Sequence, residues 1–98
     1  MAKGPESLVK KKVVEVLKQR GAYYFYPVTG GYGASGVPDI VACVNGRFLG
    51  IEVKADAKKR GPTALQQKNL RQINETGGVG VVIDANNLDE LSEVMERL

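Results

Sequence analysis

Residues 36–55 contain the side chains with the clearest chemical potential, two acids and a lysine within a predicted β-hairpin. Two apolar runs, Ile40–Val44 and Phe48–Val53, flank Asn45-Gly46, a dipeptide typical of two-residue hairpin turns. Because so short a turn fixes which residues pair across the hairpin, the alignment of the two strands can be counted outward from it.

This alignment places Asp39 directly opposite Glu52, and strand alternation puts Lys54 on the same face. Opposed side chains on one face have Cβ atoms only about 4.5–5.5 Å apart, so two carboxylates there repel each other. A divalent cation between them would replace the repulsion with ligation. In the purely structural alternative, Asp39 caps a turn and Glu52 pairs with Lys54.

The composition predicts one domain, residues 1–98, and excludes several kinds of site. The chain has 98 residues, 43% of them hydrophobic, and no histidine, which excludes catalytic triads with histidine and His-ligated zinc. Its single cysteine, Cys43, falls in a predicted strand, where we expect a small core residue. No run is long enough to span a membrane and the start lacks the apolar core of a signal peptide, so we expect a cytoplasmic protein.

Positive charge is concentrated in the first three quarters of the chain. Residues 1–71 carry 13 of the 14 Lys and Arg but 5 of the 11 Asp and Glu, a net charge of +8, whereas residues 72–98 carry −5. A basic body suits a polyanion such as nucleic acid, although a solvated surface explains the charge equally well. The run Lys58, Lys59 and Arg60 lies in a predicted loop suited to phosphate contacts.

Hydrophobic periodicity predicts an α/β fold with the order αβββαβα, a mixed sheet flanked by helices. The expected elements are a helix over 5–17, strands over 22–28, 40–44 and 48–53, a helix from about 63 to 76, a buried strand over 79–83 and a helix from about 88 to 98. We expect the apolar stripe of the last helix to face the core or a second copy of the chain.

Two polar side chains project from the predicted apolar faces of helices. Glu6 lies on the same side of the first predicted helix as Val9 and Val13. This position either directs the acid toward the site or places a carboxylate favourably near the helix N-terminus. Gln66 lies within the arc marked by Leu65 and needs a partner, either in the site or in the backbone.

The glycine-rich segment before the hairpin matches G-x-G-x-x-G at Gly31–Gly36, but it leads into a strand instead of a helix. We therefore expect no nucleotide cofactor. Tyr32 in this segment could stack on a base or sugar, although a plain connecting loop is as compatible with the sequence. We include Lys11, from the first helix, among the expected nucleic-acid contacts.

Pro38-Asp39 followed by Glu52-Val53-Lys54 resembles the PD-(D/E)XK signature of metal-dependent nucleases. With Glu6 in the preceding helix and Gln66 in the following one, nearly the whole chain is similar to the stand-alone VRR-NUC branch, which is often found in phages. The resemblance implies a restriction-endonuclease-like core and dimers like those of Holliday junction resolvases.

The resemblance also implies roles for individual residues. Asp39, Glu52 and the Val53 carbonyl would bind Mg²⁺ or Mn²⁺, and Lys54 would be the catalytic lysine. Glu6 and Gln66 match accessory positions, Glu6 through a water or a second ion. The expected function is phosphodiester hydrolysis in branched DNA, such as four-way junctions or flaps, by a homodimeric endonuclease.

A catalytically inactive nucleic-acid-binding module of the same fold is the alternative. That alternative predicts a broken acid pair, whereas both acids and the lysine are present. If the chain is phage-encoded, it would act in the cytoplasm of a bacterial host.

Overall fold

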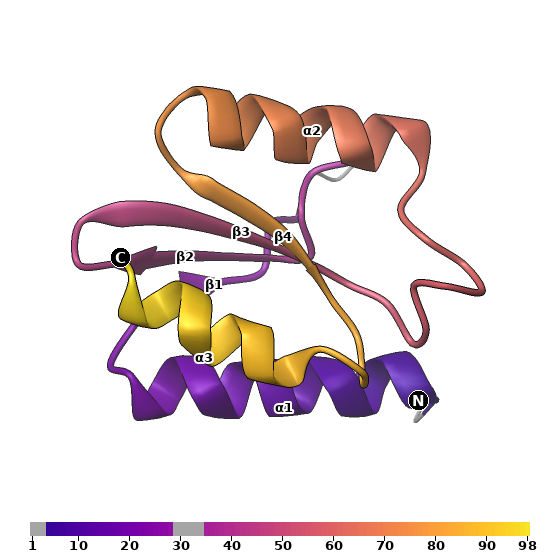
Figure 1. Ribbon diagram of the computed structural model, residues 1–98, viewed down its shortest axis with the longest axis horizontal. Helices are drawn as coiled ribbons and strands as arrows, with labels where there is room; N and C mark the ends of the chain where they lie inside the picture. Colours follow the sequence, from indigo (N-terminus) through magenta and orange to yellow (C-terminus); the bar gives the residue numbers. More distant parts are fainter. Residues whose placement is uncertain (1–3, 29–34) are drawn as a thin grey trace.

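The computed structural model describes residues 4–28 and 35–98 and has an α/β fold with three helices on a four-stranded sheet (Figure 1). The strand order is β1-β2-β3-β4, antiparallel for the first two pairs and parallel between β3 and β4. The predicted order αβββαβα is confirmed. The elements are α1 (Pro5–Gln19), β1 (Tyr23–Phe25), β2 (Ile40–Val44), β3 (Arg47–Val53), α2 (Ala64–Glu75), β4 (Val79–Ile83) and α3 (Leu88–Glu96).

The main core lies between the sheet and the pair α1 and α3, while α2 covers the opposite face (Figure 1). Alternate strand residues point into this core because successive side chains of a strand face opposite sides. The apolar stripe of α3 therefore belongs to the core, one of its two predicted positions. The fully or almost fully buried core residues include Val9, Val13, Leu17, Ile40, Leu49, Ile51, Val53, Ile83, Leu91 and Met95.

Two predictions about burial are wrong. Cys43 is exposed, because α2 packs on β3 and β4 and leaves the neighbouring part of the sheet open. The strand β4 is only half-buried except at Ile83, because it forms an edge of the sheet instead of its centre.

The open part of the sheet carries three aromatic side chains around Cys43. Tyr23 pairs with Cys43, which in turn pairs with Phe48, so all three face the same side, and Phe25 follows Tyr23 on that side. Tyr23 is 73% exposed, Phe25 49% and Phe48 47%. We call these four residues the open aromatic face.

The segment before Asp39 is held against α2 by a glycine. Gly36 has a φ of +78°, and a Cβ there would lie 2.8 Å from the Leu65 carbonyl carbon and 2.9 Å from its oxygen. The Asn69 side-chain amide also donates to the Ser35 carbonyl at 3.1 Å. The close contact with the helix backbone therefore fixes how the chain enters the hairpin.

We expect Gly36→Ala to destabilise the fold more than Gly21→Ala. Gly21 also has a left-handed φ, +69°, but a Cβ there would meet nothing within 4 Å. Gly21→Ala should cost about 1 kcal/mol for the backbone conformation alone, and Gly36→Ala a further ~1–3 kcal/mol for the clash with α2. Urea unfolding measures both variants, and equal losses would contradict the contact.

Candidate functional site

The hairpin has the predicted register. Ile40 pairs with Ile51 and Val44 with Arg47 across a turn in which Asn45 and Gly46 have φ values of +51° and +79°. Two consecutive positive φ angles are the geometry of a type I′ turn, which matches the twist of the strands that it joins.

Continuing this register by one residue sets Asp39 opposite Glu52, as predicted. Asp39 Oδ2 accepts a hydrogen bond from the Val53 backbone N–H at 2.8 Å. The carboxylate is thus tied across the hairpin to the end of β3, which differs from the turn cap of the structural alternative. The bond fixes the orientation of Asp39 beside Glu52.

Glu52 is almost completely buried, with 2% of its surface exposed, and its Oε1 has no hydrogen-bond partner among the described residues. Burial raises the pKa of Glu52 to about 8, and the negative charge of the neighbouring Asp39 contributes in the same direction. An unpaired buried carboxylate oxygen is costly, so this position favours a proton or a cation.

Lys54 offsets only part of this cost. Its Nζ lies 3.6 Å from Glu52 Oε2, which is an ion pair but too long for a hydrogen bond, and its charge lowers the Glu52 pKa. Its backbone N–H donates to the Ile83 carbonyl at 3.0 Å, which anchors this residue to the end of β4. The structure therefore brings together the two acids and the lysine that the sequence predicts.

The residues present fit a hard divalent cation. Mg²⁺ is commonly held by one or two carboxylates while it keeps several waters, and the unpaired oxygen of Glu52 beside Asp39 supplies such ligands. Within residues 4–28 and 35–98, no group of three or more Asp, Glu, Cys or His is placed to hold a metal ion. Glu6 is therefore not part of a three-acid cluster with this pair.

Glu6 lies on a neighbouring cavity instead. It is exposed and lines a space of about 290 Å³ together with Lys54, Asp56, Lys59, Arg60 and Ala55. A role for Glu6 through water or at a second ion stays a prediction. Because Lys54 forms an ion pair with Glu52 and also lines this cavity, the cavity adjoins the candidate site.

The Gln66 side chain forms a backbone hydrogen bond, which is one of the two alternatives that the sequence left open. Its Oε1 accepts from the Thr63 N–H at 2.9 Å, and its own N–H donates to Thr63 Oγ1 at 3.2 Å, forming a capping box at the start of α2. A catalytic role stays a prediction and would have to use the amide NH₂. The expected apolar arc is wrong at Leu65, which is 46% exposed.

The basic residues Lys58, Lys59 and Arg60 are exposed on a loop that two aspartates shape. Asp56 accepts from the Lys58 N–H through its side chain and from the next two amides through its carbonyl. Asp84, at the end of β4, accepts from the Ala57 N–H at 2.8 Å.

Asp84 is a positioning residue that the sequence analysis missed. Its side chain is buried and also accepts from the Asn86 N–H, and these backbone hydrogen bonds lower its pKa. The acid-and-amide sequence Asp84-Ala85-Asn86-Asn87 marks a turn, but only the fold shows that this turn meets the basic loop.

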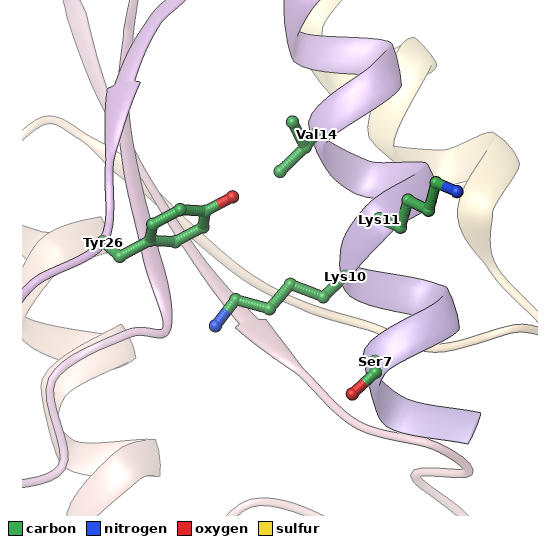
Figure 2. Close-up of a pocket in the computed structure, with 5 residues that line it drawn as sticks. All are labelled: Ser7, Lys10, Lys11, Val14 and Tyr26. Carbon is green, nitrogen blue, oxygen red and sulfur yellow. The ribbon is translucent and has the colours of Figure 1, made fainter. Parts of the chain in front are cut away.

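The other two predicted nucleic-acid contacts have different outcomes. Tyr32 lies outside the described residues. Lys11 lines a second cavity of about 290 Å³, between α1 and the chain after β1 (Figure 2). The sequence analysis did not name Lys10 and Tyr26, which line the same cavity. Lys10 lies one turn after Glu6 in the first helix, and Tyr26 lies within the first predicted strand.

No protein-family model matches this sequence, and neither a curated protein nor a solved structure gives a significant match. None of the helices in the described part of the chain is long and apolar enough to cross a membrane.

We expect Glu52→Gln to change how the stability of the metal-free protein depends on pH. The folded state holds a proton on Glu52 up to about pH 8, whereas the unfolded chain releases it near pH 4.5. The free energy of unfolding should therefore fall as the pH rises between these values, by about 1.4 kcal/mol for every pKa unit that separates the two states. Glu52→Gln removes this decline.

Urea unfolding in EDTA across this pH range measures the effect, with Glu93→Gln as the control. Glu93 is an exposed glutamate on α3, so its substitution should leave the decline intact. Parallel pH profiles for Glu52→Gln and the wild type would contradict a raised Glu52 pKa.

Proposed function

We propose that this protein is a metal-dependent deoxyribonuclease with a restriction-endonuclease-like core, of the PD-(D/E)XK type that its sequence resembles. The observation that carries the proposal is the opposition of Asp39 and the buried, incompletely paired Glu52, with Lys54 beside them. A protein that needed these residues only for folding would gain stability by replacing the buried acid with an apolar side chain.

Asp39, Glu52 and the Val53 carbonyl would hold the ion, Mg²⁺ or Mn²⁺. When bound, such an ion lowers the pKa of a coordinated water and stabilises the negative charge that develops on the phosphate. The Val53 N–H holds Asp39 in place through the 2.8 Å bond, so this ligand needs little reorganisation. Burial of Glu52 excludes bulk water from one side of the site.

Lys54 supplies the positive charge closest to the acid pair. Its ammonium forms a loose ion pair with Glu52, at 3.6 Å from Oε2. It would orient the attacking water or help to deprotonate it, and it would stabilise the pentavalent phosphorane. The exposed Lys58, Lys59 and Arg60 would bind flanking phosphates of the DNA and hold the scissile bond near the acids.

A nucleic-acid-binding module without catalysis is the competing function. It requires no pair of opposed acids, and two carboxylates facing a phosphate backbone would weaken binding unless a cation lay between them. The arrangement of Asp39, Glu52 and Lys54 therefore favours hydrolysis over binding alone.

Asp39→Asn and Lys54→Ala should each reduce Mg²⁺- or Mn²⁺-dependent cleavage by at least ~100-fold, the scale expected for loss of a group acting directly in the reaction. Gel analysis of a panel of linear, flapped and four-way-junction DNAs measures the rate and the preferred substrate. Lys68→Ala, at an exposed position on α2, is the matched control and should retain activity.

Circular dichroism should show that both variants remain folded. DNA binding by the wild type without cleavage of any substrate would favour the binding module. Full activity in Asp39→Asn or Lys54→Ala would overturn the assignment of the site.

We also propose that the protein acts as a homodimer and that the open aromatic face contributes to the interface. Three large aromatic side chains lie on one sheet face, two on the edge strand β1 and one on β3. Such a group is typical of a surface that a partner covers. A second copy would place two acid pairs in one assembly, which suits symmetrical cleavage of branched DNA.

Phe48→Glu should shift the protein from dimer to monomer in sedimentation velocity, because it puts a charge into this apolar surface. Leu8→Glu is the control, since Leu8 is comparably exposed, at 57%, but lies on α1. A wild type that sediments as a monomer, or a dimer that Phe48→Glu leaves intact, would contradict this interface.

A further inference from the structure

The cavity beside α1 combines a lysine ammonium with an aromatic ring. Ser7, Lys10, Lys11 and Val14 of α1 face Tyr26, the residue after β1, across a space of about 290 Å³. Figure 2 shows the Lys10 side chain reaching toward the Tyr26 ring, while the ammonium group of Lys11 points away from the ring. The Lys10 Nζ lies 4.7 Å from the ring centroid.

This cavity lies on the α1 side of the sheet, near the strand ends that carry the acid pair. The register that pairs Phe25 with Val41 continues to place Tyr26 opposite Ile40, whose side chain belongs to the core under α1. Asp39 and Glu52 alternate with core residues along their strands, so the two acids face the other side of the sheet.

The helix α1 joins the two cavities. Glu6 lines the cavity with Lys54, Lys59 and Arg60, and the adjacent Ser7 lines the cavity with Lys10 and Tyr26. A polyanionic strand lying along the first turns of α1 would therefore meet Lys10 in one cavity and Lys54, the neighbour of Glu52, in the other.

We propose that the cavity between α1 and Tyr26 binds one unpaired nucleotide of the DNA strand that runs along α1 to the cavity with Lys54. This inference rests on the proposed nuclease function and specifies which part of the substrate the site recognises. Lys10 would leave the ring to bind the phosphate, because a charge-assisted hydrogen bond is stronger than an exposed cation–π contact. The base would then stack on the face of the Tyr26 ring that Lys10 had covered.

The geometry favours an unpaired nucleotide over a duplex. Tyr26 is 46% exposed, so its ring offers a face to a ligand that enters from solvent. In a duplex both faces of each internal base are covered by its neighbours, so only a single-stranded segment can present a base to this ring. The site would therefore select substrates with an unpaired segment, such as a flap.

Fluorescence anisotropy with a labelled single-stranded oligonucleotide and a blunt duplex of equal length tests the proposal, in EDTA so that no strand is cut. Tyr26→Ala should weaken binding of the single strand ~5- to 100-fold, as expected for one stacked base, and leave duplex binding unchanged. Tyr26→Phe keeps the ring and should bind like the wild type.

Lys10→Met should weaken single-strand binding and reduce the slope of log K against log salt by about 0.7, the value for one phosphate contact. Lys12→Met is the matched control, because Lys12 is exposed on the same helix but does not line the cavity. Its slope should stay that of the wild type.

The outcomes separate this inference from the proposed function. If the wild type cleaves DNA but Tyr26→Ala or Lys10→Met binds the single strand normally, the nucleotide subsite is wrong and the nuclease stands. Equal losses on single strand and duplex would overturn the selection of an unpaired base. If the wild type neither binds nor cleaves any DNA, the nuclease function itself fails.

Discussion

The site depends on the opposition of two carboxylates across a hairpin whose turn has only two residues. Asp39 and Glu52 are distant in sequence, and the turn at Asn45-Gly46 aligns them. Folding therefore brings two acids together, and burial of Glu52 disfavours its charged form. A protein retains such an arrangement most simply when a ligand or a reaction requires it.

The surrounding structure holds this costly pair in place from several directions. The Val53 amide orients Asp39, Gly36 lets the preceding segment touch α2, and Asp84 ties the basic loop to the end of β4. The first of these interactions holds a proposed ligand directly, whereas the other two act on neighbouring segments. All three limit movement around the acid pair, which is the preorganisation that the proposed reaction would require.

Local patterns predicted the features that depend on neighbouring residues. The Asn-Gly turn allows only one short pairing, so the register of Asp39 with Glu52 followed from counting, and alternation placed Lys54 on their side. The capping box of Gln66 also had a local signature, Thr63 followed three residues later by glutamine, yet the sequence left its partner open. Cys43, Leu65 and Asp84 behaved differently, because their environments depend on where α2 and the basic loop pack in the fold.

The tight turn also has a consequence for how this chain can vary. One residue inserted between Asn45 and Gly46 would shift the pairing by a step and bring a side chain from the opposite side of the sheet to face Glu52. The loop that carries Lys58 joins its elements without setting any strand pairing, so it can tolerate a change of length. Homologues of this protein should therefore keep the number of residues in the hairpin. Insertions and deletions should occur in the loop that carries Lys58.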